Sequence, residues 1–269
     1  MNLFMRFING IEHRSSGKMK VIPGVIGMLV LLVLWEITVR LYLMASGNLQ
    51  FSGFLPGRAF VALTGMCLQP IFWRSIVASL TRIGIGLFIA GCIGVPSGLI
   101  VGSFPLLKRV TNPPIQFVRM ISPISWMPIA LVFLPGFEQA IIFIITMATL
   151  WPILLNTRTG VGSVDEQWLE MARNQGASPR QLIRKVIYPA TLPHIIAGLR
   201  LAVGIGWVVL VPAELLGISS GLGYLINDAR DTLEYDRLMA VIITIGIIGF
   251  AIDSLFQLLI LRFDWRSRS

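Results

Sequence analysis

Six apolar runs constrain this chain more than any other feature of its sequence. Each has roughly the twenty residues that an α-helix needs to cross a bilayer. They lie at residues 21–43, 76–101, 114–134, 139–155, 192–216 and 238–261. Only 13% of the 269 residues are charged, about half the fraction that is usual in a soluble domain. The sequence therefore predicts an all-α integral membrane protein with about six transmembrane helices.

The basic residues gather on one side of the predicted membrane. When the N-terminus is placed in the cytoplasm, 14 of the 22 Lys and Arg residues fall inside and four fall outside. The remaining four, Arg40, Arg82, Arg119 and Arg200, lie within the apolar runs. This bias follows the positive-inside rule, which predicts that both termini face the cytoplasm. Orientation accounts for the whole net charge of +9, so no nucleic-acid partner is implied.

We expect one membrane domain over residues 21–261, between cytoplasmic segments at 1–20 and 262–269. The first apolar run is longer than the h-region of a signal peptide, so we expect it to remain as a span. The second run is rich in glycine, and Gly94 and Gly98 form a small-residue pair that favours close helix packing.

Several kinds of chemistry are not expected from this composition. Two cysteines, one in a loop and one in a span, and two histidines are too few for a disulfide framework or a metal site. The segment Gly17-Lys18-Met19 lacks the leading glycine and the hydroxyl of a phosphate-binding loop. We find no catalytic, cofactor-binding or metal-binding constellation, and the chain is not expected to be an enzyme.

A polar segment at residues 163–193 separates the fourth and fifth apolar runs and carries two helix-start signals. Ser163 with Glu166, and Ser178 with Gln181, have the spacing of capping boxes. The sequence therefore predicts two short helices in this segment, which together form a cytoplasmic hairpin.

The turn and the end of this hairpin are also marked in the sequence. Gly176 stands where a helix C-terminus favours a left-handed residue. Pro189 is expected to end the second helix, and Pro193 to open the next span. An ordinary solvated loop would not need two capping boxes. A DNA-binding helix-turn-helix is disfavoured because both ends are tethered to the membrane. We interpret the hairpin as a docking element for a soluble protein.

The hairpin resembles the "EAA" signature of permease subunits of bacterial ABC importers. That pattern is E-A-A, three residues, Gly, nine residues and I-x-L-P, and the spacing of residues 170–189 fits it. Met171, Val186 and Tyr188 depart from it, standing for Ala, Ile and Leu. The ATPase-coupling residues that the resemblance implies are Glu170, Met171, Ala172, Gly176, Ala177, Val186 and Pro189.

The resemblance also implies a set of partners. These are a second permease copy in a homodimer, two ATP-binding cassette subunits that hold ATP and Mg, and an extracytoplasmic solute-binding protein. The expected location is the lipid bilayer of a bacterial inner membrane. The hairpin, over residues 163–191, would be the coupling region between spans four and five.

A finer resemblance is to the nitrate, bicarbonate, sulfonate and taurine branch of these permeases, and most of all to nitrate permeases. The stretches that carry it are residues 114–119, 125–128, 197–202, 212–217, 220–224 and 228–231. It implies a small anion, nitrate or nitrite or bicarbonate, as solute. A sulfonate, taurine or other small solute is the alternative within the branch. An ATP-independent secondary transporter or channel is the alternative from another class.

The third apolar run contains too many prolines for an unbroken helix, namely Pro114, Pro123 and Pro128, with Pro113 and Pro135 at its ends. Broken backbone in a membrane is tolerated only where it is buried or lines a cavity. We therefore predict that this run contributes to the translocation path. Candidate path residues, from this and later spans, are Arg119, Ser122, Ser125, Trp126, Arg200 and Glu214.

Charges within the spans have two possible roles. They should pair with one another or face a polar cavity, because an isolated charge is costly in lipid. One hypothesis is that Arg119 or Arg200 attracts an anion. The alternative is structural pairing, or snorkelling of side chains near the span ends.

Overall fold

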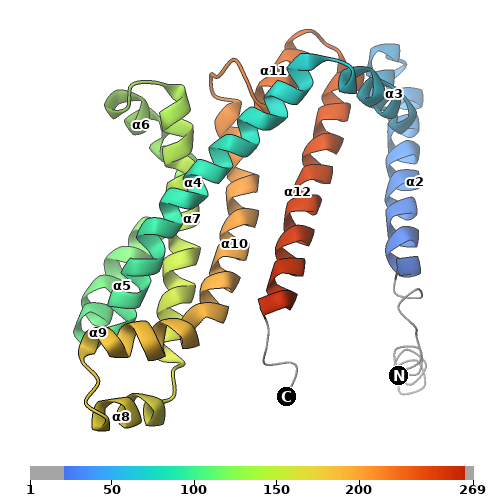
Figure 1. Cartoon of the computed structure of the whole chain (residues 1–269). Coiled ribbons are helices and arrows are strands. Elements are labelled where there is room, and N and C mark those ends of the chain that lie inside the picture. The colour runs from blue at the N-terminus through green and yellow to red at the C-terminus, as the bar shows by residue number, and fades with distance from the viewer. Residues whose placement is uncertain (1–20, 264–269) are drawn as a thin grey trace.

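Long α-helices dominate residues 21–263, the part of the chain that the computed structural model describes (Figure 1). Five continuous helices are long and apolar enough to cross a membrane, and a bent pair gives a sixth candidate span. No strand occurs within the described residues. The five helices are α2 (Val21–Ser46), α4 (Pro70–Ser103), α7 (Phe137–Gly162), α10 (Tyr188–Glu214) and α12 (Tyr235–Phe263). The prediction of an all-α membrane fold with about six spans is confirmed.

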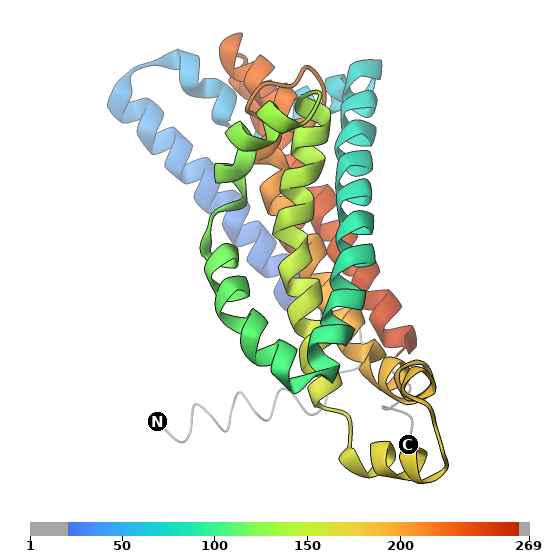
Figure 2. The same ribbon diagram turned by 90° about the vertical axis from the view of Figure 1, so that its left-hand side faces the viewer.

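Helices α4, α7 and α10 pack against one another as the centre of the bundle (Figure 2). Three glycines of α4 let it approach α7 closely. A β-carbon added at Gly86, Gly94 or Gly98 would lie 2.7, 3.0 or 2.6 Å from a side-chain atom of α7. Helices associate in lipid through close van der Waals packing, which small residues permit. The packing role predicted for the glycine-rich second span is therefore confirmed.

The third span is broken, as its prolines predict. It consists of α5 (Pro105–Met120), the short 3₁₀ helix η2 (Pro123–Trp126) and α6 (Met127–Phe133), and the two arms meet at 89°. Between the arms, Ile121 has extended backbone, and Ser122 is also non-helical, with φ −56° and ψ 129°. The clash of a proline ring with the preceding residue disfavours helix there, which explains a break directly before Pro123.

The polar hairpin projects from one end of the bundle (Figures 1 and 2). It contains α8 (Glu166–Asn174), α9 (Pro179–Leu182) and the π-helical turn η3 (Ile183–Ile187), which leads into α10. The two short helices that the sequence predicts are both present.

The expected start of the first hairpin helix is wrong by two residues. Asp165, not Ser163, is the N-cap of α8, and its carboxylate accepts from the amide of Gln167 at 2.9 Å. Helix α7 continues to Gly162, so the Ser163 hydroxyl lies 2.9 Å from both the Gly160 carbonyl oxygen and Nε2 of His194. Glu166 is thereby the first residue of α8 rather than the third, and no capping box forms at this end.

Pro189 does not end the second hairpin helix, contrary to the expectation from sequence. Helical backbone runs unbroken from Pro179 to Glu214. In η3 the amide of Tyr188 donates to the carbonyl of Ile183, five residues back. Pro189 lies directly after this π turn, and the helix continues through it. Pro193 lies inside α10 and does not open a separate span.

The opposite end of the bundle carries three shorter elements, η1 (Leu49–Phe54), α3 (Pro56–Cys67) and α11 (Leu222–Asp231). All three contact α12. Helix α2 is joined to this end by the indole of Trp35, which donates to the carbonyl of Phe54 at 3.0 Å.

Candidate functional site

The turn of the hairpin is fixed by a hydrogen-bonded C-cap. Gly176 has φ +79°, a conformation that favours glycine. Its amide donates to the carbonyl of Arg173 at 2.9 Å, and the amide of Ala177 donates to Ala172 at 3.0 Å. This is a Schellman motif, in which the chain reverses without leaving the last helical carbonyls unpaired. The left-handed turn predicted at Gly176 is confirmed.

The helix after the turn begins at the predicted capping box. The amide of Gln181 donates to Oγ of Ser178 at 3.4 Å, and the amide of Ser178 donates to Oε1 of Gln181 at 2.8 Å. Pro179 occupies the first helical position. Together with the Schellman motif, this box defines the geometry of the segment between α8 and α9.

Helix α8 offers an exposed face at the tip of the molecule. None of its residues is buried. The side chains of Trp168 and Met171, three residues apart on one face, are both largely exposed. Two large apolar side chains exposed on one face of a short polar helix favour an interaction surface.

A cavity of about 440 Å³ lies between α8 and the start of α10. It brings together four of the predicted coupling residues, Met171, Ala172, Val186 and Pro189. Glu170 is exposed beside it on α8. Gly176 and Ala177 form the turn next to it. The residues of the EAA-like pattern are thus gathered in one projecting structure.

A second cavity, of about 480 Å³, lies at the break of the third span. We call it the break cavity. Arg119 from α5 and Trp126 from η2 line one side, and α7 and α10 line the other. Ser122 and Ser125 are exposed in the adjacent break. Four of the six predicted path residues therefore lie in or beside one cavity.

Arg200 lies elsewhere, in an ion pair between α10 and α12. Its Nε and Nη2 donate to the two carboxylate oxygens of Asp253 at 3.1 and 3.2 Å, and Gln257 donates to the same carboxylate at 3.1 Å. The two charged side chains are 37% and 51% exposed. They line a hollow of about 800 Å³ that shares Leu201, Ile205 and Val209 of α10 with the break cavity.

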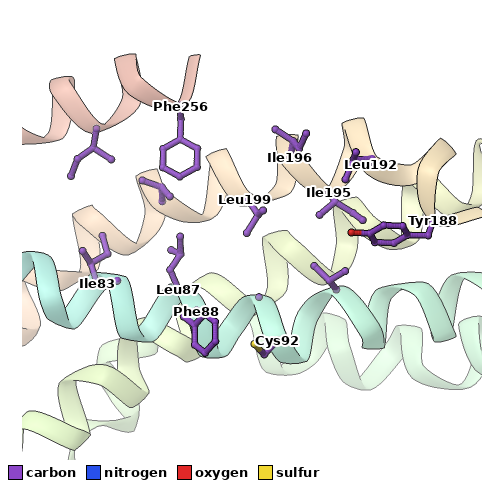
Figure 3. Close-up of a pocket in the computed structure, with 15 residues that line it drawn as sticks. Ile83, Leu87, Phe88, Cys92, Tyr188, Leu192, Ile195, Ile196, Leu199 and Phe256 are labelled. Atoms are coloured by element: carbon purple, nitrogen blue, oxygen red, sulfur yellow. The ribbon is translucent and has the colours of Figure 1, made fainter. Parts of the chain in front are cut away.

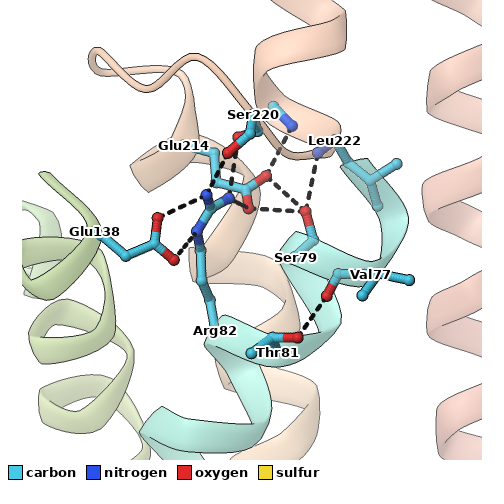
Figure 4. A network of polar contacts seen from close by, with 9 residues as sticks. Val77, Ser79, Thr81, Arg82, Glu138, Glu214, Ser220 and Leu222 are labelled. Atoms are coloured by element: carbon cyan, nitrogen blue, oxygen red, sulfur yellow. Dashed lines mark hydrogen bonds and ion pairs between the residues drawn. The ribbon is translucent and has the colours of Figure 1, made fainter. Parts of the chain in front are cut away.

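Glu214 does not lie on an open surface, in contrast to the other predicted path residues. Its side chain is fully buried and is bound by Nη1 of Arg82 at 2.6 Å, by the Ser79 hydroxyl at 2.8 Å and by the amide of Gly223 at 2.9 Å (Figure 4). A passing solute could not contact this carboxylate in the present conformation.

Arg82 is the centre of this buried network. Its Nε and Nη2 donate to the two oxygens of Glu138 at 3.0 and 2.9 Å, and Nη2 also donates to the Ser220 hydroxyl at 2.7 Å (Figure 4). The network joins α4, α7, α10 and the loop before α11. Sequence reasoning missed the role of Glu138, which lies in the first turn of α7.

An apolar groove of about 650 Å³ runs between α4, α10 and α12 (Figure 3). Leu87 of α4 points toward Leu199 of α10 and Phe256 of α12 across it (Figure 3). No charged side chain lines this groove. Its chemistry suits hydrocarbon better than a polar solute.

Comparisons with known proteins agree with this architecture. A family model described as "Binding-protein-dependent transport system inner membrane component" matches residues 94–268. The chain is 36% identical over 185 residues to the bicarbonate transport system permease protein CmpB of Synechocystis sp., covering 68% of this chain but only 65% of that protein. It is 31% identical over 246 residues to the nitrate import permease protein NrtB of the same organism, covering 87% and 86%.

A solved structure of a bacterial alginate ABC transporter, in complex with its periplasmic protein, contains a chain of the same fold. The TM-score is 0.60 at 17% sequence identity, and the match covers 93% of this chain and 96% of that one. The fold is therefore shared over almost the whole length.

Proposed function

Because this chain belongs to the family of binding-protein-dependent transport system inner membrane components, we propose that it is the permease subunit of an ATP-driven importer. In this proposal it forms the membrane path for a small anion, and ATP is hydrolysed by separate subunits. The projecting hairpin, with its exposed Trp168 and Met171, is the observation that carries the proposal.

The hairpin is suited to transmit motion from a docked ATPase subunit. Its turn is held by the Schellman motif at Gly176 and by the Ser178 capping box. Helical backbone then continues from Pro179 into α10 without a break. Helix α10 contributes Leu201, Ile205 and Val209 to the break cavity. A displacement of the hairpin would therefore act directly on a wall of the proposed path.

The proposed complex contains two copies of this chain, two ATP-binding cassette subunits and an extracytoplasmic binding protein. The hairpin and both termini lie on the cytoplasmic side of the bacterial inner membrane. The half-exposed pair Arg200–Asp253 supports a second copy or an aqueous path against α10, since charges in spans rarely face lipid. Closure of the ATPase pair moves the spans between outward-open and inward-open states, and the solute passes the break in the third span.

Nitrate or bicarbonate is the proposed solute, because these anions are named for relatives that share about a third of their aligned residues with this chain. A sulfonate or taurine is the alternative within the branch. The solute-binding partner would decide between them. Calorimetric titration of that protein with nitrate, bicarbonate and taurine would name the solute.

The proposal is tested by transport in proteoliposomes that contain the chain, its ATPase subunits and the binding protein. We expect uptake only with ATP. Gly176→Val should reduce uptake at least about tenfold, since a β-branched residue is strained at φ +79°. Gly162→Ala is the matched control, because an added β-carbon there meets nothing within 4 Å.

Two results would contradict the proposal. One is uptake by the purified chain alone without ATP, which a secondary transporter or channel predicts. The other is unchanged uptake and unchanged ATPase binding in Gly176→Val.

A further inference from the structure

We propose that Arg119 makes the break cavity a binding site for a small monovalent oxyanion, and that Arg200 does not serve this role. This inference rests on the proposed function and names the residue that would hold the solute within the membrane. Four lines of evidence from the described residues carry it: charge pairing, the lining of the cavity, its depth and its size.

Arg119 differs from the other arginines that the sequence places in the spans. Arg40 pairs with Glu36, Arg200 with Asp253, and Arg82 with Glu138 and Glu214. Arg119 has no carboxylate within 4.0 Å among residues 21–263. The charge of Arg200 is already neutralised by the bidentate carboxylate of Asp253, so Arg200 attracts a further anion only weakly. Arg119 retains a whole positive charge.

The lining of the break cavity matches an anion rather than a cation. No carboxylate is among its lining residues. Its polar groups are the guanidinium of Arg119, the indoles of Trp126 and Trp151, and the amide of Asn156. One N–H of Asn156 donates to Pro152 at 2.8 Å, which leaves the other free to donate. Guanidinium and indole groups offer only donors, which oxyanions accept.

The cavity lies near the middle of the bundle along its length. Its α7 residues, from Met147 to Asn156, include the midpoint of that 26-residue helix. Leu201, at the midpoint of the 27-residue helix α10, also lines it. An unpaired arginine at this depth is costly unless it faces a cavity or a counter-ion. A bound anion would supply the missing counter-charge.

The volume of the break cavity is also appropriate for a small oxyanion. A water molecule takes about 30 Å³ in the liquid, so a cavity of about 480 Å³ holds a small oxyanion with part of its hydration shell. The apolar walls from α7 and α10 lower the local dielectric. A single arginine then attracts an anion more strongly than it would in water.

The two tryptophans that line the cavity provide a direct test. The full chain is placed in lipid nanodiscs, and quenching of its tryptophan fluorescence is measured with iodide, with caesium and with neutral acrylamide. We expect Arg119→Gln to lower the iodide quenching assigned to Trp126 and Trp151 about tenfold, through loss of local anion concentration. Arg119→Lys should retain most of it, and acrylamide quenching should not change.

Matched variants assign the signal to this site. Arg109→Gln removes the same charge from the same helix, at an exposed position outside the cavity, and should leave iodide quenching unchanged. In the Trp126→Phe, Trp151→Phe double variant, the part of the quenching that depends on Arg119 should disappear. The inference is overturned if Arg109→Gln has the same effect as Arg119→Gln, or if the double variant leaves the Arg119-dependent part in place.

Displacement of iodide by other anions can be measured on the unaltered chain, so this test does not depend on whether a variant folds. At matched ionic strength, nitrate and bicarbonate should displace iodide, and bulky gluconate should not. Equal displacement by all three would mean simple screening and would refute the site. These experiments need neither ATP nor partner proteins, so they separate this inference from the proposed function. Arg119-dependent iodide quenching together with failed ATP-driven uptake would refute only the proposed function. Normal ATP-driven uptake together with iodide quenching that does not depend on Arg119 would refute only this inference.

Discussion

Arg82 binds two carboxylates and a loop at the end of the bundle opposite the hairpin. Its side chain is 1% exposed, and Glu214 is fully buried beside it. The guanidinium donates to Glu138, Glu214 and Ser220, so all three of its nitrogens are satisfied. Burying charges is costly unless they are paired and hydrogen-bonded. The network meets that condition, so removing one of its side chains should lower the free energy of unfolding substantially.

Arg82→Met should destabilise the chain strongly, because it leaves Glu214 buried without its counter-ion. The expected cost is about 3–5 kcal/mol, the range for breaking a buried pair. Thermal unfolding of the purified chain in detergent would show it as a lower midpoint. Arg40→Met is the control, since it breaks the exposed pair with Glu36 and should have little effect. A similar shift in both variants would mean that the buried network contributes nothing special.

Among the secondary-structure elements, those with local signals are predicted from sequence and those that depend on distant contacts are not. The break before Pro123 and the turn at Gly176 follow from the conformational limits of proline and glycine. The start of α8 was mispredicted because both Ser163 and Asp165 can cap a helix. Only the packing of α7 onto α10, seen in the contact between Ser163 and His194, decides between them.

Long-range pairings are also invisible to local reasoning. Ser79 and Arg82 reach Glu214 across more than 130 residues, and nothing near any of the three marks the others as partners. The candidate path could therefore be predicted at the broken span, whose signal is local. That Glu214 is buried and does not line the path could be seen only in the three-dimensional structure.

The contact of α4 with α7 makes an element-scale prediction. Gly98→Val should weaken it, because even a β-carbon would lie 2.6 Å from Cβ of Thr157 and 2.7 Å from the carbonyl oxygen of Leu154. Overpacking of this kind costs about 1–3 kcal/mol. Gly84→Val on the same helix is the control, since nothing lies within 4 Å of an added β-carbon. Thermal unfolding in detergent should show a lower midpoint for the first variant only. Equal midpoints would contradict the close packing.

In the whole molecule, the hairpin and the buried network lie at opposite ends of one long helical path. The hairpin leads through η3 into α10, whose last residue, Glu214, is bound by Arg82. Between these ends, α10 lines the break cavity and carries Arg200. A helix that is anchored at one end and moved at the other tilts rather than slides. The proposed transport cycle therefore requires a defined orientation, with the hairpin on the ATPase side.

That orientation can be measured with cysteine labelling. Cys67 is exposed at the end of α3, opposite the hairpin (Figure 1). Asn174 is exposed on α8. The excess of basic residues around the hairpin predicts that α8 faces the cytoplasm.

In intact spheroplasts, a membrane-impermeant maleimide should label Cys67 in the Cys92→Ser variant. It should label an Asn174→Cys variant lacking both native cysteines only after the membrane is permeabilised. The reverse pattern would place the hairpin outside, where no cytoplasmic ATPase could reach it, and the coupling mechanism would fail with it.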